Sequence, residues 1–399
     1  MKNYAIISEF NPFHNGHAYL VEKCREHGAT HITAVMSGNF VQRGEPAIFP
    51  KHIRTLMALK NGVDLVTELH LPFAVSNAQQ FAENGTAVVN AMNCVDCLAF
   101  GSECGDISLL NELSRLIISD NFQTKLREQI TTGISYPPAL TNTMKIMNPS
   151  LSPLMSEPNN ILGIEYIKAL IHTGSQIKPV TFRRIGDAYN DTYASSEFAS
   201  AASIRKLIYE NKSFTKYIPE NCTDIFLSEI QKGNTAFLSD NERGFILKLR
   251  QMSSDDIADI ADVNEGLENR IKTAVMNSAS LEEIIERTKS KRYTYARIKR
   301  ILLACLLDIK KDYMNKYAPY IRVLGFNSRG AEILSCVKQK KLAPLVTKIS
   351  RTENLSSSEK AFLDLELSSG DIYYTFTRNI KPCGEEYRNG IVVLKQQDL

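Results

Sequence analysis

Short apolar runs alternate with amphipathic stretches along the first hundred residues. Four runs have the length and composition of buried strands: residues 4–8, 31–38, 63–69 and 96–100. Three stretches between or around them carry apolar side chains at helical spacing: residues 18–25, 51–59 and 74–92. Because strands that alternate with helices build parallel sheets, this half of the chain is expected to be an α/β domain with a parallel sheet.

The pattern changes after about residue 210. Four amphipathic stretches separated by Gly, Ser, Asn and Asp predict helices: residues 217–231, 240–251, 261–277 and 280–288. We therefore expect an α/β domain over residues 1–210 and a mainly α-helical domain over residues 211–399. Near the end of the chain, the apolar runs 372–376 and 391–394 are expected to pair as a small hairpin.

Composition limits the class of protein. The chain has 399 residues, which favours two domains, and is 43% hydrophobic and 23% charged. No apolar run approaches the ~18–20 residues of a membrane helix, and no signal peptide is expected at the N-terminus, so we predict a cytoplasmic protein without a membrane partner. The net charge is only +3, so any nucleic-acid surface must be a local patch.

The eight cysteines are expected to be reduced and mostly buried. Cys94 and Cys97, with Cys104 nearby, have spacing that could suit a metal ion. However, Cys97 begins a predicted strand and no second ligand pair follows at zinc spacing, so no metal ligands are assigned.

The first candidate site lies between the first strand and the first helix, in Pro12-Phe13-His14-Asn15-Gly16-His17. A helix N-terminus presents free N–H groups that can hold a phosphate. His14 and His17 add donors that can follow charge moving between phosphate oxygens, and Gly16 permits close approach of a ligand. The alternative is that both histidines only cap the helix.

The second candidate site is residues 287–300, which contain seven basic residues, two tyrosines and no acid. Clustered cations bind a phosphate backbone, and aromatic rings stack on unpaired bases. The candidate RNA-binding residues are Lys289, Lys291, Arg292, Tyr293, Arg297 and Arg300. The alternative is a solvated helix start whose charges pair with Glu282, Glu283 and Glu286.

The HxGH pattern at the first strand-to-helix turn resembles the nucleotidylyltransferase superfamily, which has a Rossmann-like fold. Five longer runs, in order, resemble the bacterial tRNA(Met) cytidine acetate ligases: residues 9–17, 36–47, 100–103, 158–166 and 184–186. This resemblance is strong over residues 1 to about 210 and loose beyond. It implies that ATP and acetate give acetyl adenylate and pyrophosphate. The acetyl group then passes to N4 of the wobble cytidine of elongator tRNA(Met), with release of AMP.

The resemblance also implies roles for particular residues. His14 and His17 are the catalytic, phosphate-facing pair. The residues carried over as ATP-binding are Ile7, Ser8, Glu9, Phe10, Asn11, Pro12, Phe13, Asn15, Gly16, Gly101, Asn160, Arg184 and Arg205. A magnesium ion bridging the phosphates is expected on chemical grounds, although no residue marks its ligands.

Several of these assignments have alternatives. Asn159 could cap the helix that begins there, in which case neither Asn159 nor Asn160 touches ATP, and Arg183 could replace Arg184. Ser200 could cap the helix that carries Arg205. The loop with Gln42, Arg43 and Glu45 could close over acetate or cytidine, or could be an ordinary surface loop held by salt bridges.

Two other classes of function remain. A small-molecule adenylyltransferase would also use the HxGH pattern, but needs little beyond the α/β domain. A non-catalytic nucleotide- or RNA-binding scaffold would not require intact His14, Gly16 and His17.

Overall fold

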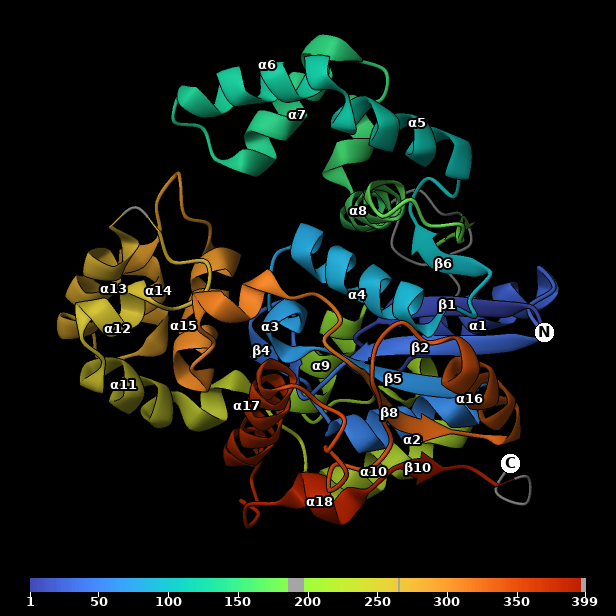
Figure 1. Cartoon of the computed structure of the whole chain (residues 1–399). Helices are drawn as coiled ribbons and strands as arrows, with labels where there is room; N and C mark the ends of the chain where they lie inside the picture. Colours follow the sequence, from blue (N-terminus) through green and yellow to red (C-terminus); the bar gives the residue numbers. More distant parts are fainter. Residues whose placement is uncertain (186–196, 265, 396–399) are drawn as a thin grey trace.

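The computed structural model describes residues 1–185, 197–264 and 266–395 (Figure 1). The main sheet is eight-stranded, with the order β10-β8-β5-β2-β1-β6-β7 and β9 beside β8. Its strands are β1 (Asn3–Ser8), β2 (His31–Ser37), β5 (Leu65–Leu69), β6 (Cys97–Ser102), β7 (Lys178–Arg183), β8 (Ile321–Phe326), β9 (Leu345–Val346) and β10 (Val392–Val393). A separate two-stranded hairpin joins β3 (Phe40–Val41) to β4 (Glu45–Pro46).

The five strands from β5 to β7 are parallel, as the sequence pattern predicted. β1 lies between β2 and β6, with Ile7 opposite Val35 and Ser8 opposite Met36. Parallel strands end at one edge of a sheet, so the segments that follow β1, β2, β6 and β7 meet there. The HxGH turn, the β3–β4 hairpin and Gly101 therefore share this edge.

Helices cover both faces of the sheet. Successive residues of a strand point to opposite faces, so Ile6 and Ile7 enter different hydrophobic cores. The Ile6 core includes side chains of α1 (Asn15–Glu26), α2 (Lys51–Lys60), α9 (Ala201–Tyr209) and α10 (Thr223–Gln231). The Ile7 core includes side chains of α4 (Ala78–Met92), α8 (Pro158–His172) and α16 (Ser328–Lys340).

Three helices extend this second layer away from the sheet. They are α5 (Ile107–Ile118), α6 (Asp120–Thr131) and α7 (Tyr136–Met147), drawn at the top of Figure 1. Leu110, Leu113 and Phe122 join the same core as Ile7, which fixes this group to α8. The group is an insertion between β6 and α8, because the chain leaves the sheet after β6 and returns to it through α8.

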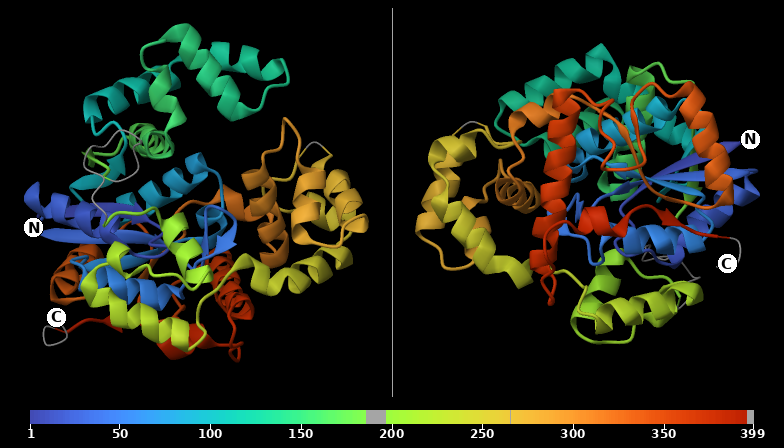
Figure 2. Two further views of the ribbon diagram at one scale, coloured as in Figure 1. Left: turned by 180° about the vertical axis from the view of Figure 1, so that it is seen from behind. Right: turned by 60° about the horizontal axis from the view of Figure 1, so that its bottom comes forward.

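A second group of helices forms a lobe with its own core. The lobe consists of α11 (Glu242–Gln251), α12 (Ser254–Ala258), α13 (Leu267–Met276), α14 (Leu281–Thr288) and α15 (Tyr295–Leu307). Ile271, Ile284 and Leu303 are 0% exposed within it. Figure 2 shows the lobe beside the sheet in both views. Phe40 and Tyr373 of the remaining structure belong to the same core, so the lobe is packed against the sheet domain.

The C-terminal segment returns to the sheet, which the division at residue 210 did not anticipate. β8 pairs antiparallel with β5, and β10 pairs parallel with β8. The expected terminal hairpin is wrong, because residues 372–373 end the helix α17 (Ser357–Tyr373) and Val392–Val393 pair with β8. The buried side chains of β8 join both sheet cores: Ile321 and Val323 enter the Ile7 core, and Leu324 enters the Ile6 core.

Two short helices complete the described structure, α3 (Leu71–Ala74) and α18 (Glu385–Asn389). Over the described ranges, no helix combines the length and the apolar character that crossing a membrane requires. Gly186, the last residue of one of the runs that resemble the ligases, lies outside the described residues.

Candidate active site and nucleic-acid interface

The HxGH turn is held by its own histidines. His14 is the N-cap of α1, and its Nδ1 accepts a hydrogen bond of 3.0 Å from the Gly16 N–H. His17 Nδ1 accepts one of 3.3 Å from the His14 N–H. A Cβ at position 16 would lie 2.8 Å from His14 Cε1, so only glycine leaves the His14 ring in place. Both histidines therefore cap the helix, as the alternative expected, and each uses one ring nitrogen to do so.

These contacts fix the tautomers of both rings. A ring nitrogen that accepts a hydrogen bond carries no proton, so the neutral rings hold their proton on Nε2. The ring centroids lie 3.9 Å apart. Burial, with Arg184 and Arg205 nearby, lowers the pKa of His14 to about 3. Burial and His14 lower the pKa of His17 as well. Each of these adjacent neutral rings therefore keeps an Nε2–H donor, a group that suits phosphate oxygens.

Aromatic side chains support the turn from behind. Phe10 and Phe13 are 1% and 0% exposed, and their rings lie 5.0 and 5.5 Å from that of His17. Asn15 Nδ2 donates to the carbonyl oxygens of Glu197 (2.9 Å) and Lys216 (3.1 Å). Asn11 Oδ1 accepts from the Ile48 N–H at 2.7 Å. Most side chains of this run therefore shape the turn, and its backbone and two imidazoles remain for a ligand.

Gly101 and Arg184 come together at the neighbouring strand ends. Gly101 lies opposite Phe182 in the β6–β7 pairing, and a Cβ at Gly101 would be 3.0 Å from Arg184 Cγ. The Arg184 N–H donates to the Ser102 carbonyl at 3.0 Å. The structure thus brings Gly101, Arg184 and the HxGH turn to one edge, and the choice of Arg184 over Arg183 as the ATP contact stays a prediction.

Asn160 supports this edge in a different way from the expected one. It is 0% exposed, its Oδ1 accepts from the Cys104 N–H at 3.1 Å, and its Nδ2 donates to Leu154 O at 3.3 Å. The alternative in which Asn159 caps the helix is wrong, because Glu157 is the N-cap. The Glu103 carboxylate accepts from the Asn159 and Asn160 N–H groups instead. Asn160 therefore holds the Gly101 loop against α8.

Arg205 reaches the HxGH turn from α9. Ser200 caps this helix, as predicted, by accepting from the Ser203 N–H at 3.2 Å. Arg205 Nη1 donates to the Asn11 carbonyl at 2.8 Å, and Nη2 lies 3.5 Å from Glu45 Oε2. Burial lowers the pKa of Arg205, which Glu45 opposes. One guanidinium thus touches both the HxGH loop and the β3–β4 hairpin.

The same hairpin contacts the helical lobe. The other oxygen of Glu45, Oε1, pairs with Lys299 Nζ of α15. Gly44 has a φ of +71°, and a Cβ there would lie 2.8 Å from the Arg300 backbone nitrogen. Glycine is needed at this position both for its backbone angle and for the close approach of α15. Lys299 of α15 is therefore connected to the HxGH loop through two side chains, Glu45 and Arg205.

The basic stretch, residues 287–300, contains exposed, ion-paired and buried side chains. Lys291 and Arg292 are exposed. Lys289 lies 3.4 Å from Glu286, as the salt-bridge alternative anticipated. Arg297 pairs with Asp262 at 3.0 Å. Tyr293 is only 8% exposed and belongs to the lobe core, so the expectation that its ring stacks on a base is not met. Arg300 is half-buried, with the hairpin at Gly44 against its backbone.

One residue at this site was not predicted from the sequence. Arg54 of α2 is 0% exposed and donates to the carbonyl oxygens of Glu9 (2.6 Å) and Ser37 (3.0 Å), and to that of Gly38. It ties the ends of β1 and β2 together. Glu45 was expected in a loop that closes over acetate or cytidine or is held by salt bridges, and its ion pairs agree with the second alternative. The sequence signal for Arg54 was its position in α2, because the helical period predicts that this position is buried.

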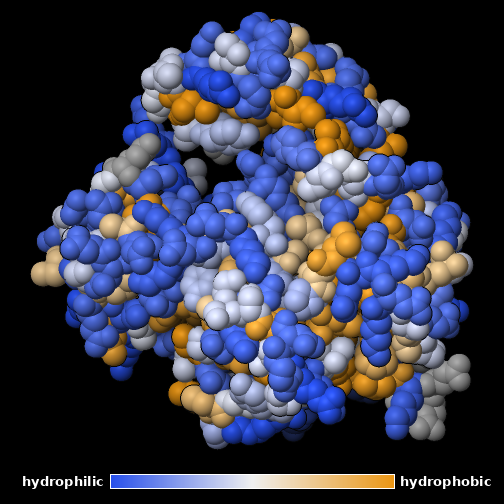
Figure 3. Space-filling model, in the orientation of Figure 1, coloured by the Kyte–Doolittle hydropathy of each residue, from blue (hydrophilic) through white to orange (hydrophobic). Residues whose placement is uncertain are grey.

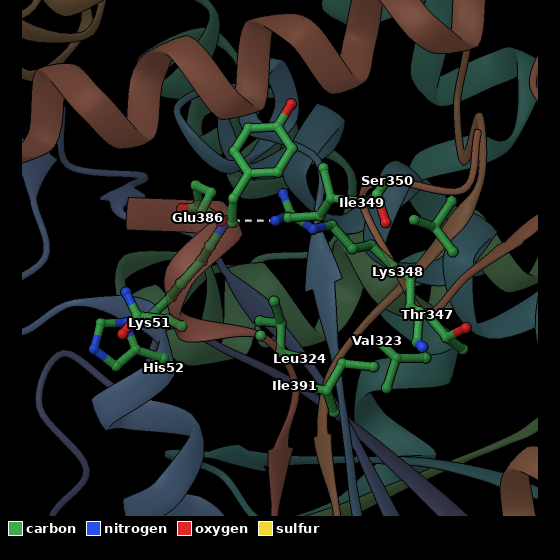
Figure 4. Close-up of a pocket in the computed structure, with 15 residues that line it drawn as sticks. Lys51, His52, Val323, Leu324, Thr347, Lys348, Ile349, Ser350, Glu386 and Ile391 are labelled. Carbon is green, nitrogen blue, oxygen red and sulfur yellow. Dashed lines mark hydrogen bonds and ion pairs between the residues drawn. The ribbon is translucent and has the colours of Figure 1, made fainter. Parts of the chain in front are cut away.

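A separate cavity of about 380 Å³ lies between the start of α2, β8 and α18 (Figure 4). Lys51 and His52 of α2, Leu324 of β8 and Glu386 line part of it. Burial lowers the pKa of His52 to about 4. Lys51 pairs with Glu386 at 2.9 Å and with Glu68 at 2.7 Å, so its charge is already compensated. None of the HxGH residues lines this cavity.

The fold and the HxGH site are those of a nucleotidyl transferase. The sequence profile of the HIGH Nucleotidyl Transferase family matches residues 1–387. The crystal structure of Thermotoga maritima TmcAL bound with alpha-thio ATP superposes with a TM-score of 0.92, at 33% identity, covering 99% of this chain and 100% of that one.

The match narrows to one family. The tRNA(Met) cytidine acetate ligase of Acetivibrio thermocellus is 36% identical over 99% of this chain and 100% of its own length. That of a Thermoanaerobacter species is 39% identical over 98% and 99%. The chain belongs to the tRNA(Met) cytidine acetate ligase family, and the predicted resemblance is confirmed.

Proposed function

We propose that this protein is a cytoplasmic ligase that activates acetate with ATP and transfers the acetyl group to N4 of the wobble cytidine of elongator tRNA(Met). The observation that carries the proposal is the ion-paired contact between two sites, in which Glu45 joins Arg205 at the HxGH turn to Lys299 of the basic helix. An enzyme that transfers an activated acyl group to RNA needs its nucleotide site and its RNA surface at this close range.

The first step is attack of an acetate oxygen on the α-phosphorus of ATP. The Pα–O bond to pyrophosphate breaks, and acetyl adenylate remains. No proton moves, so the residues need only position the reactants and stabilise charge. The Nε2–H groups of His14 and His17 would donate to phosphate oxygens, and Arg184 and Arg205 would supply positive charge at the same edge.

ATP would lie along the ends of β1, β6 and β7. The backbone from Ile7 to Gly16 would surround the phosphates, while Gly101 permits the adenosine to approach β6 closely. Asn160 would keep the Gly101 loop in place. In the second step the N4 amine attacks the acetyl carbonyl, the C–O bond to AMP breaks, and a proton leaves the amine.

The helical lobe would bind the tRNA. Lys291 and Arg292 are exposed at its surface, in the stretch before α15. Figure 3 shows the surface hollowed between the α5–α7 group at the top and the lobe at the left. We propose that the anticodon loop enters from this side, with its phosphates against the lobe.

Magnesium belongs to the proposal in a limited way. The described residues contain no group of three or more His, Cys, Asp or Glu side chains arranged to hold a metal ion. A magnesium ion that accompanies ATP would take its ligands from the phosphates and water, as this ion commonly does. None of the steps above is routed through it.

The test is transfer of isotope-labelled acetate into unmodified elongator tRNA(Met), with ATP and without it. ATP-dependent label at the wobble cytidine is the expected result. No label from a folded protein that binds ATP would overturn the proposal and direct attention to small phosphorylated acceptors, screened by pyrophosphate release. A tRNA with uridine at the wobble position is the matched substrate control, because it lacks the N4 amine.

A further inference from the structure

Four side chains on elements that pack around β1 and β2 have buried polar atoms without a protein partner. These atoms are Ser37 Oγ, Gln42 Nε2, Tyr166 OH and both amide atoms of Asn84. Ser37 and Asn84 are 0% exposed and Tyr166 is 1% exposed. Buried polar groups nearly always have hydrogen-bond partners, because leaving one unpaired is costly. Several such groups at one place indicate a site for a polar ligand.

Three chain segments bring Ser37 and Gln42 to the same point. Met36 lies opposite Ser8 in the β1–β2 pairing, so Ser37 lies beside Glu9. The backbone N–H of Gln42 donates to Glu9 Oε1 at 2.9 Å. The ends of β1, β2 and the β3–β4 hairpin therefore converge around the Glu9 carboxylate.

Two helices, α4 and α8, lie on one face of the sheet next to β1. A Cβ at Gly85 would lie 2.8 Å from Ile7 Cδ1, so α4 rests directly on the end of β1, and the fully buried Asn84 directly precedes Gly85 in this helix. α8 packs beside α4 on the same face. Tyr166 of α8 lies against β6, the neighbour of β1, with its ring centroid 5.6 Å from that of Phe100. Burial raises the pKa of its phenol, and the Glu9 carboxylate raises it further.

A buried positive charge lies beneath the strand ends. The Arg54 guanidinium is hydrogen-bonded only to carbonyl oxygens, those of Glu9, Ser37, Gly38 and Phe49. No ion pair to it occurs among the described residues. Burial also raises the pKa of Glu9, which favours its neutral form and reduces its repulsion of an anion. Arg54 therefore favours an anion at this point.

We propose that Ser37, Asn84 and Tyr166, with Gln42, form the pocket that binds the acetate carboxylate. This inference rests on the proposed function and names the acid-binding side of the same site. Hydroxyl and amide donors would hold one carboxylate oxygen, while the other faces the α-phosphate at the HxGH turn. All of these polar atoms are buried, so the pocket would favour a short monocarboxylate over longer acids.

The test uses two variants that each remove a single oxygen, Tyr166→Phe and Ser37→Ala. We expect the KM for acetate in acetate-dependent ATP–pyrophosphate exchange to rise about tenfold, the loss typical of a hydrogen bond to a charged group. The KM for ATP and the affinity for tRNA should stay within about twofold, because these oxygens do not face the phosphates or the lobe.

Ser278→Ala is the matched control. Ser278 Oγ is also buried without a protein partner, but it lies in the helical lobe between α13 and α14. It should leave the acetate KM unchanged. Since each variant deletes an unpaired oxygen, none should lower the thermal unfolding temperature, which separates a binding effect from misfolding.

Asn84→Ala supplies a second readout, because it removes an amide and enlarges the pocket. The preference for acetate over propionate should fall, which a purely structural role for Asn84 would not produce. Unchanged acetate KM and unchanged acid preference in folded variants would overturn the pocket while leaving the proposed function standing. Absence of acetate-dependent exchange in the unmodified protein would instead overturn the proposed function itself.

Discussion

The Glu45 carboxylate lies between two cations from distant parts of the chain, 3.5 Å from Arg205 Nη2 and in contact with Lys299 Nζ. The three side chains are 13–25% exposed, so their attraction is less screened than at an open surface. Arg205 in turn donates to the Asn11 carbonyl of the HxGH loop. The position of α15 and the geometry of the nucleotide site are therefore connected through Glu45.

Replacing Glu45 should separate the two steps of the reaction. In Glu45→Ala, the lobe loses its ion pair to the nucleotide site and the acceptor base is less well placed. We expect tRNA acetylation to fall by about tenfold or more, since small misplacements of reactants are costly. ATP–pyrophosphate exchange should fall much less, because His14 and His17 keep their hydrogen bonds.

Glu282→Ala is the control for this comparison. Glu282 accepts a hydrogen bond from Tyr295 OH at 2.8 Å, so it also joins α15 to a neighbour, but within the lobe. Equal losses of both steps in Glu45→Ala, or an equal effect of Glu282→Ala on transfer, would contradict the linking role.

The histidines should matter for the first step alone. His14→Ala or His17→Ala removes an Nε2–H donor and part of the helix cap, so adenylate formation should fall by about 10²–10³-fold. Binding of tRNA, measured by filter retention, should change little, because both residues lie away from the lobe surface. His172→Ala, at the exposed end of α8, is the control and should behave like the unmodified protein. Parallel loss of tRNA binding would indicate misfolding.

The low pKa of His14 predicts a particular pH dependence. Its pKa falls from the ordinary 6.5 to about 3, so the folded protein resists protonating it. The unfolded chain binds that proton as the pH falls below about 6.5, and the stability that neutral His14 contributes is then lost progressively toward pH 3. The urea midpoint of the unmodified protein should therefore fall more steeply between pH 7 and 4 than that of His14→Asn. Adenylate formation should show no inflection near pH 6.5 from this residue.

Exposed cations before α15 should bind the phosphate backbone of tRNA. Lys291→Ala with Arg292→Ala should weaken tRNA binding and reduce the slope of log affinity against log salt by up to about two, one for each phosphate that is no longer neutralised. Lys338→Ala with Lys340→Ala is the charge-matched control, because these lysines are exposed on α16, on the opposite side of the sheet domain in Figure 1. Equal effects of both pairs would show that only net charge matters.

The sequence predicted the parallel sheet and the position of the HxGH turn because both are local. Alternation of strands and helices and a motif next to the first strand need no knowledge of distant contacts. The return of Ile321–Phe326 to the sheet could not be predicted in this way, since it depends on pairing with β5 some 250 residues earlier in the chain. The same reason applies to Glu45, whose partners come from α9 and α15.

The other differences between the sequence-based expectations and the structure come from the burial of side chains. Tyr293 lies in a stretch with the composition expected for RNA binding, but it occupies the turn between α14 and α15 and its ring joins the lobe core. Asn160 was predicted to contact the nucleotide, which stays a prediction, and its buried amide also bonds Cys104 through Oδ1 and Leu154 through Nδ2. A motif identifies which residues approach a site, whereas the packing of neighbouring elements decides which of their atoms remain available.

The last prediction concerns stability at the junction of α17 with the sheet. Glu366 is 2% exposed, its Oε1 lies 2.8 Å from His70 Nδ1, and Tyr320 OH donates to its Oε2 at 2.7 Å. Burial opposes ionisation, but His70 and Arg322 outweigh it and lower the pKa of Glu366 to about 2. Glu366→Gln removes the charged partner of His70 and one of three carboxylates around Arg322, which keeps Glu68 and Glu386, so it should reduce the free energy of unfolding by about 1–3 kcal/mol.

Glu332→Gln provides the comparison, because Glu332 also contacts a histidine, His31, at 3.2 Å. The Glu332 side chain is 68% exposed, so its loss should cost only about 0–1 kcal/mol. Urea unfolding at pH 7 measures both. The difference should shrink as the pH falls from about 4.5 toward 2, since the depressed pKa of Glu366 contributes stability only while the unfolded carboxyl is ionised. Equal reductions in the two variants would mean that the buried Glu366 carboxylate adds no more stability than one at the surface.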